Sequence, residues 1–156
     1  MKERTLILLK PDAINRGLCG EILSRFEKAG IKIVASKMAK PDKDHYFKHY
    51  EEIGTMVTRR GQKIFEITVD MMMEGPVIAF VLEGYEVVEV VRKLVGTTEP
   101  KAALPGTIRG DYSYIGFKSA DELGIGVKNL VHASGNSEEA KKEIALWFND
   151  DELFDY

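Results

Sequence analysis

The run Val77-Ile-Ala-Phe-Val-Leu82 decides the fold class, because its apolar residues follow one another without a polar break. A continuous apolar run of this length is typical of a strand that is buried on both faces. Gly75-Pro76 separates the run from the preceding segment, and apolar residues recur at helical spacing over residues 85–95. A buried strand followed by an amphipathic helix indicates a sheet that is covered by helices.

The elements on either side extend this pattern over the whole chain. Residues 5–9 form a second apolar run, which should end before Pro11 because proline cannot donate to a sheet ladder. The other expected strands cover residues 31–38 and 127–133, and the expected helices cover residues 18–29, 42–53, 62–73, 85–95 and 137–148. Two strand–helix–strand units in this order predict one α+β domain over residues 1–156: a ferredoxin-like antiparallel sheet with helices packed on it. A long loop without sustained periodicity, residues 96–126, precedes the last strand, and such loops are usually functional or disordered.

Composition excludes several classes of partner. The 156 residues carry a net charge of -3, so no broad basic face is available for nucleic acid. The N-terminal residues lack the apolar core of a signal peptide, and the apolar runs are too short to cross a bilayer. Cys19 is the only cysteine, is expected to be a small buried side chain, and suits a reducing compartment. We therefore expect a cytoplasmic protein that binds neither membrane nor nucleic acid.

The common nucleotide-binding motifs are absent. No Walker A sequence is present, and Gly124-Ile125-Gly126 is only a fragment of a dinucleotide-binding fingerprint. His45 and His49 lie four residues apart on an expected helix, a spacing that can bind zinc, but no third ligand is evident in this polar segment. We interpret these two histidines as part of a solvated helix face.

His132 lies in or at the end of an apolar strand, where a lone histidine is more often structural than catalytic. Its context favours chemistry, because Lys10, Arg92 and Arg109 are also expected at the ends of elements or in loops. Cations that face one histidine suit phosphoryl transfer, in which they neutralise phosphate oxygens while a neutral imidazole attacks.

Stretches along nearly the whole chain resemble the nucleoside diphosphate kinase family, in the family's order. They are Thr5-Leu-Ile-Leu-Leu-Lys10-Pro11-Asp12, Arg16-Gly17, Gly20-Glu21-Ile22, His49-Tyr50, Gly75-Pro76-Val77, Leu82-Glu83-Gly84, Pro105-Gly-Thr-Ile-Arg109-Gly-Asp111, Asn129-Leu-Val-His132-Ala-Ser134 and Glu143-Ile144-Ala-Leu-Trp147-Phe148. The resemblance implies a ping-pong reaction, in which a nucleoside triphosphate, typically ATP, passes its γ-phosphate to a histidine and a nucleoside diphosphate then takes it.

The resemblance also implies roles for individual residues. His132 would accept the phosphate, Glu143 would hold the other ring nitrogen, and Ser134 would help to place Glu143. The residues that match phosphate- and ribose-binding positions are Lys10, Tyr50, Arg92, Thr98, Arg109 and Asn129. Mg²⁺ would be held by the nucleotide phosphates, with few or no protein ligands. The family is usually a homo-oligomer, with a hexamer favoured here over a tetramer, and the loop 98–112 is where such subunits often meet.

Two regions depart from the family pattern. Ile64 aligns with the aromatic residue that stacks on the base and Phe65 with its neighbour, so either side chain could cover the base. About ten extra residues, judged by the family spacing and typical loop lengths, lie between Asp111 and Asn129. The segment 112–128 could therefore fold over the site or extend a subunit contact.

Two alternatives to an active kinase remain at this point. The chain could be a nucleotide-binding regulatory module of the same fold that has lost catalysis, although such a module would not need His132 and Glu143. It could also use the sheet as an RNA platform, but the sequence pI of about 5.7 argues against this.

Overall fold

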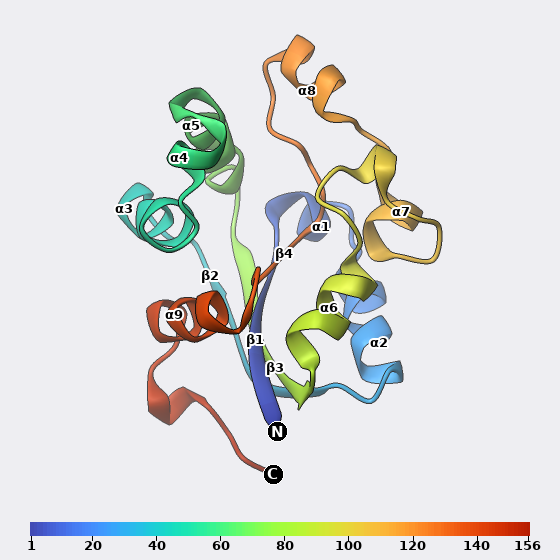
Figure 1. The fold of residues 1–156 in the computed structure, drawn as a ribbon, viewed down its shortest axis with the longest axis vertical. Helices are drawn as coiled ribbons and strands as arrows, with labels where there is room; N and C mark the ends of the chain where they lie inside the picture. Colours follow the sequence, from blue (N-terminus) through green and yellow to red (C-terminus); the bar gives the residue numbers. More distant parts are fainter.

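The computed structural model describes all residues 1–156, and its centre is a four-stranded sheet (Figure 1). The strands are β1 (Lys2–Leu9), β2 (Lys32–Ala39), β3 (Val77–Tyr85) and β4 (Val131–Ala133). They lie in the order β2-β3-β1-β4, and every neighbouring pair is antiparallel. This arrangement confirms the predicted ferredoxin-like α+β fold. The run 77–82 forms most of β3, which lies between β2 and β1 inside the sheet.

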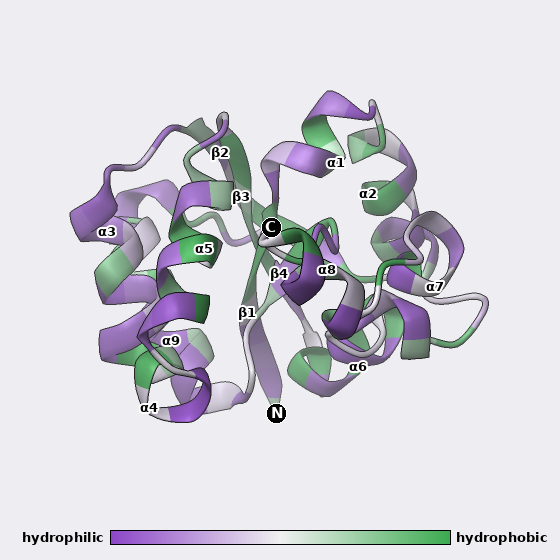
Figure 2. Ribbon diagram, turned by 90° about the horizontal axis from the view of Figure 1, so that it is seen from above, coloured by the Kyte–Doolittle hydropathy of each residue, from purple (hydrophilic) through white to green (hydrophobic).

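Helices cover both faces of the sheet (Figures 1 and 2). The α-helices are α1 (Pro11–Asn15), α2 (Cys19–Lys28), α3 (Lys43–Phe47), α4 (Met56–Arg60), α5 (Gln62–Met72), α6 (Val87–Val95), α7 (Ile108–Tyr112), α8 (Phe117–Leu123) and α9 (Ser137–Trp147). A π-helix, η1 (Lys48–Ile53), and two 3₁₀ turns, η2 (Pro100–Ala102) and η3 (Asp150–Glu152), complete the structure. None of these helices combines the length and the apolar composition that crossing a membrane requires.

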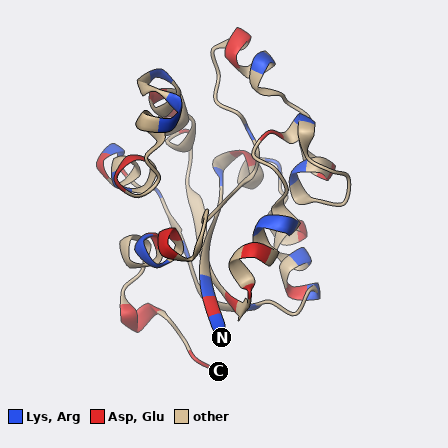
Figure 3. Cartoon of the chain, viewed as in Figure 1, with Lys and Arg blue, Asp and Glu red and all other residues tan.

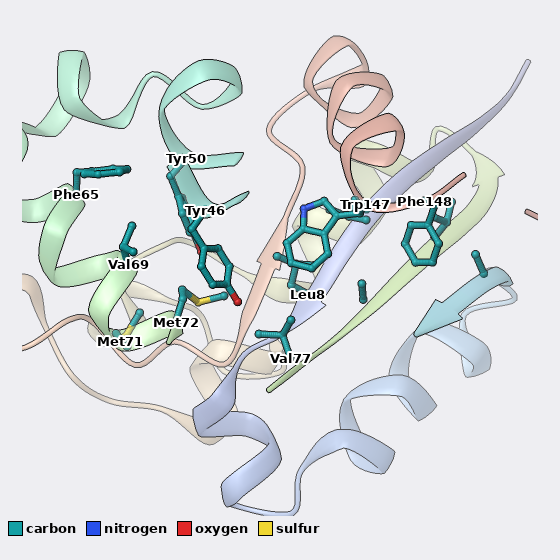
Figure 4. Close-up of a cluster of buried hydrophobic side chains, with 14 of the residues drawn as sticks. Leu8, Tyr46, Tyr50, Phe65, Val69, Met71, Met72, Val77, Trp147 and Phe148 are labelled. Carbon is teal, nitrogen blue, oxygen red and sulfur yellow. The ribbon is translucent and has the colours of Figure 1, made fainter. Parts of the chain in front are cut away.

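The alternation of side chains along the strands produces two cores. On one face, Leu6 and Leu8 of β1 pack with the buried residues of α3, η1, α5 and α9 (Figure 4). On the other face, Ile7 and Leu9 pack with α2, α6 and α7. Consecutive β1 residues thus stabilise opposite layers, as the period of two in a strand requires. Charged residues of both signs are scattered over the outer helices (Figure 3).

Three expected elements differ from the structure. The helix expected over 42–53 begins as α3 and continues as the π-helix η1, and π-helical turns are frequent at functional sites. The last strand covers only Val131–Ala133 instead of 127–133, because Leu130 adopts a left-handed φ of 74° that ends the strand geometry. The loop expected over 96–126 is ordered and contains η2, α7 and α8.

Candidate active site

His132 is held in the middle of β4, directly opposite Leu8 of β1. Its ring Nε2 lies 3.0 Å from Oε1 and 3.1 Å from Oε2 of Glu143, which projects from α9. Ring Nδ1 makes no hydrogen bond within the protein, and the side chain keeps 18% of its exposure. A carboxylate only accepts hydrogen bonds, so the neutral ring carries its proton on Nε2. The Nδ1 lone pair is therefore available to attack an electrophile.

Glu143 is itself fixed by a second partner. The Ser134 hydroxyl, which is fully buried, donates to Glu143 Oε2 at 2.5 Å, and Ser134 Oγ accepts from the Leu6 backbone N–H at 3.2 Å. Burial alone would raise the pKa of Glu143, but the attraction of a protonated His132 ring and the hydrogen bond from His132 outweigh it. With smaller contributions from His49 and Ser134, the pKa of Glu143 falls to about 2. Glu143 is thus an anion that orients the ring and stabilises positive charge on it.

Two buried cations lie beside the histidine. The Lys10 ammonium donates to Asn129 Oδ1 at 2.7 Å, and the Arg109 guanidinium donates to the backbone carbonyls of Asn129 and Gly96, each at 3.1 Å, and to that of Val131. Burial and then repulsion from Arg109 lower the pKa of Lys10 to about 7. Charges that are buried and only partly compensated in this way prefer an anionic ligand.

Arg92 of α6 is the third cation of the site. It keeps its guanidinium in the cavity and reaches the Ser134 carbonyl at 3.5 Å. Burial, followed by repulsion from Arg92, lowers the pKa of Arg109 to about 10, which leaves Arg109 charged at neutral pH. Lys10, Arg92 and Arg109 repel one another, and this repulsion is relieved when a ligand with several negative charges binds between them. A polyphosphate is such a ligand.

The turn before β4 places these groups. Leu130 adopts the left-handed conformation, an uncommon state for a residue with a side chain. Its N–H donates to Asp12 Oδ2 at 3.1 Å, and its carbonyl accepts from the Lys10 N–H at 2.9 Å. The turn thereby joins the end of β1 to the start of β4, so that Lys10, Asn129 and His132 reach one cavity.

This cavity measures about 290 Å³ and contains most of the side chains that the sequence marks as functional. Its lining includes Lys10, Tyr50, Ile64, Arg92, Thr98, Arg109, Asn129, His132 and Glu143. Ser134 lies behind Glu143 and does not line the cavity. Phe65 is buried in the core (Figure 4). The centre of its ring lies 5.9 Å from that of Phe47, edge to face. Of the two side chains expected at the base, the structure brings Ile64 to the cavity and keeps Phe65 away.

His49 is a site residue that the sequence interpretation missed. It is 1% exposed, and its ring centre lies 4.4 Å from that of His132, so its assignment to a solvated helix face was wrong. The Trp147 indole N–H donates to His49 Nδ1 at 3.1 Å, which leaves the proton of His49 on Nε2. Burial, and then the repulsion that a protonated His132 ring exerts, lower the pKa of His49 well below its ordinary value. The family motif His49-Tyr50 is the signal that could have identified it.

One cluster has the spacing of a metal site: ligand atoms of His49, His132 and Glu143 lie within 4.8 Å of one another. The hydrogen bonds of the cluster oppose that use, because His49 presents Nε2–H and not a lone pair, and Glu143 is engaged by His132 and Ser134. The other walls of the cavity carry cations. A divalent ion in this cavity would therefore be held mainly by the phosphates of a ligand and by water.

The inserted segment 112–128 forms part of the site. Its helix α8 and the residues after it contribute Phe117, Asp121, Ile125, Gly126 and Val127 to the cavity lining. The segment lies across from α4 and α5, at the end of the molecule far from both termini (Figure 1). Within this single chain it forms part of the cavity wall.

Comparisons with known proteins agree with this geometry. The sequence profile of the family described as nucleoside diphosphate kinase matches residues 3–153. The nucleoside diphosphate kinase of Borreliella burgdorferi is 46% identical over 99% of this chain and 92% of its own length, and that of Pyrococcus furiosus is 47% identical over 99% and 88%. A solved structure described as a transition state mimic of the Borrelia burgdorferi enzyme with bound vanadate and ADP matches with a TM-score of 0.96 at 45% identity, covering 99% of this chain and 92% of that one. The structure of an NDP kinase from Pyrobaculum aerophilum matches with a TM-score of 0.89 at 41% identity, and the match covers 99% of this chain and 100% of that one.

Proposed function

The chain belongs to the nucleoside diphosphate kinase family, and on this premise we propose that His132 Nδ1 carries phosphate between nucleotides. A nucleoside triphosphate such as ATP donates its γ-phosphate to the ring, and a nucleoside diphosphate then removes it. The observation that carries this proposal is the hydrogen bond between His132 Nε2 and Glu143. This bond leaves Nδ1 as the free nucleophile in a cavity lined with cations.

In the first half-reaction, Nδ1 attacks the γ-phosphorus, the bond from that phosphorus to the bridging oxygen breaks, and the nucleoside diphosphate leaves with the electron pair. The ring becomes positively charged while Nε2 keeps its proton, and the Glu143 carboxylate stabilises that charge. In the second half-reaction, a terminal phosphate oxygen of another nucleoside diphosphate attacks the phosphohistidine. The ring returns to its neutral form.

The cations and hydroxyls of the cavity hold the phosphates and the ribose. Lys10, Arg92 and Arg109 neutralise phosphate oxygens, and Tyr50, Thr98 and Asn129 supply neutral hydrogen-bonding groups along the same cavity. The Tyr50 hydroxyl is buried and has no partner within the protein, so a ligand oxygen can satisfy it. Most of the catalysis then comes from position and charge.

The residues present fit a Mg²⁺ ion that the nucleotide itself brings to the site. Mg²⁺ would be held mainly by the nucleotide phosphates and by water, and it would supply positive charge that neutralises part of the phosphate charge. The cations of the wall cannot coordinate a metal, and they instead hold the phosphate oxygens that the metal leaves free.

The reaction is tested by incubating the protein with ATP labelled at the γ-phosphate and then adding unlabelled GDP. We expect a label on the protein that is labile in acid, stable in base and transferred to GDP. His132→Ala should abolish labelling, whereas His45→Ala, which changes a half-buried histidine outside the cavity, should retain it. A protein that binds nucleotide but never acquires transferable label would instead be an inactive regulatory module.

We further propose that the protein forms a homo-oligomer, with a hexamer favoured over a tetramer. We also propose that it resides in the cytoplasm. The oligomer rests on family resemblance and on the loop 98–112, whose Leu104 is 73% exposed. The compartment rests on Cys19, the only cysteine, which remains a free thiol. Size-exclusion chromatography with light scattering tests the first proposal, and cell fractionation tests the second.

A further inference from the structure

The cavity has a deep charged part and an outer apolar part. Lys10 and Arg109 are buried at its inner end, whereas Phe117 is half-buried and Ile125 is 40% exposed at its rim. The opposite wall of the outer part comes from α5, which contributes Ile64 and Ile67. A ligand whose anionic end occupies the inner part would place its other end between these two apolar walls.

One contact bridges the two walls. The guanidinium carbon of Arg60, at the end of α4, lies 4.6 Å from the centre of the Phe117 ring, at the start of α8. Arg60 is exposed and forms no hydrogen bond or ion pair within the protein, so little besides this ring holds its guanidinium. Guanidinium groups and nucleobases are both flat, and both stack on aromatic faces. Arg60 thus occupies a place that a base can take.

The Phe117 ring is held where a nucleotide can reach it. The Phe117 backbone N–H donates to the Glu99 carboxylate at 2.8 Å, and Glu99 directly follows Thr98 of the cavity lining. The returning chain pairs with the residues just beyond α5, where Lys128 lies 3.2 Å from Glu74. The segment 112–128 is therefore tied at Phe117 and at Lys128, and Phe117, its only aromatic residue that lines the cavity, is bonded to the residue that follows Thr98.

We propose that Phe117 supplies the ring on which the nucleobase stacks, in the place of the Arg60 guanidinium, with Ile64 on the opposite wall. This inference rests on the proposed function and names the side chain that holds the base. The insertion thereby provides the aromatic face that the Ile64 position lacks. Stacking on a ring accepts every base, because each base has a π-face.

The test measures binding of Mg-ADP, Mg-GDP and Mg-pyrophosphate by isothermal titration calorimetry, without any triphosphate. Pyrophosphate has no base and reports the inner part of the cavity alone. Phe117→Ala should raise Kd for ADP and GDP about tenfold, which is the size of effect expected when one base loses its aromatic stacking partner. The same change should leave Kd for pyrophosphate unchanged. Phe117→Trp should restore nucleotide affinity. Arg60→Ala should not weaken nucleotide binding, since the base displaces this group.

Leu123→Ala is the matched control, because Leu123 lies on the same helix, is 67% exposed and does not line the cavity. Equal Kd values for ADP in Phe117→Ala and in the wild type would overturn the inference, as would an equal loss of pyrophosphate binding. A loss of ADP binding in Arg60→Ala as large as in Phe117→Ala would overturn the displacement of Arg60. Failure of the proposed function looks different, because the wild type would then not transfer phosphate at all.

Discussion

Replacement of Glu143 by glutamine tests how much the charge behind the His132 ring contributes to phosphoryl transfer. The surroundings lower the pKa of Glu143 from 4.5 to about 2 in spite of its burial, and His132 is the largest cause of that lowering. One pKa unit corresponds to about 1.4 kcal/mol, so the surroundings favour the carboxylate by about 3 kcal/mol. The attraction is mutual, and it stabilises the imidazolium character that develops as the Nδ1–phosphorus bond forms.

Glutamine keeps the hydrogen bond but removes the charge. Its amide group can face the Ser134 hydroxyl while its oxygen accepts from His132 Nε2, so the ring tautomer is preserved. A loss of about 2–3 kcal/mol of transition-state stabilisation corresponds to a rate roughly 30- to 150-fold lower. Rapid-quench measurement of His132 phosphorylation by saturating Mg-ATP isolates this step from nucleotide binding and release.

Glu138→Gln is the control for this experiment. Glu138 lies on the same helix, its side chain is 83% exposed, and its nearest charged partner is Lys142 at 3.9 Å. The control should retain the wild-type rate. A phosphorylation rate in Glu143→Gln within about threefold of the wild type would refute the argument, because it would show that the carboxylate acts only through its hydrogen bond.

Three further perturbations follow from the same geometry. The pKa of Lys10 is lowered to about 7, and a bound phosphate should raise it again. Binding of Mg-ADP should therefore take up a proton above pH 7. The affinity for Mg-ADP should fall by as much as tenfold per pH unit in that range. Calorimetry in buffers of different ionisation enthalpy measures that uptake, and proton-neutral binding at pH 8 would contradict it. Ser134→Ala removes a buried hydroxyl that bonds Glu143 and the Leu6 N–H, and should lower the free energy of unfolding by about 1–3 kcal/mol in urea. His49→Phe leaves the buried Trp147 indole N–H without an acceptor and should also lower the free energy of unfolding by about 1–3 kcal/mol. If the variant unfolds in urea at the wild-type midpoint, this hydrogen bond contributes nothing to stability.

The parts of the fold that sequence could predict are those with clear periodicity. The apolar run 77–82 and the stripe over 85–95 correspond to β3 and α6, because burial on two faces or on one stripe leaves a pattern in neighbouring residues. The short strand β4 and the left-handed Leu130 leave no such pattern. Their geometry is set by bonds to Asp12 and Lys10, more than a hundred residues earlier in the chain.

Some residues of the site could be predicted from the sequence and others could not. His132 and Glu143 could be paired through the family motifs, and the structure places them in contact. His49 could not be recognised from its polar neighbours, because η1 turns it inward against Trp147 of a distant helix. No pattern in the sequence singles out Phe117, because its proposed role depends on the position of α8 opposite Arg60.

Nuclear magnetic resonance can identify the ring nitrogen of His132 that carries the phosphate. The protein is labelled with ¹⁵N in histidine, phosphorylated with ATP and freed of nucleotide, and coupling between ³¹P and the ring nitrogens is then recorded. Because Glu143 engages Nε2, we expect coupling of a single phosphorus to Nδ1 of His132. A phosphorus coupled to Nε2, or carried by His45 or His49, would contradict it.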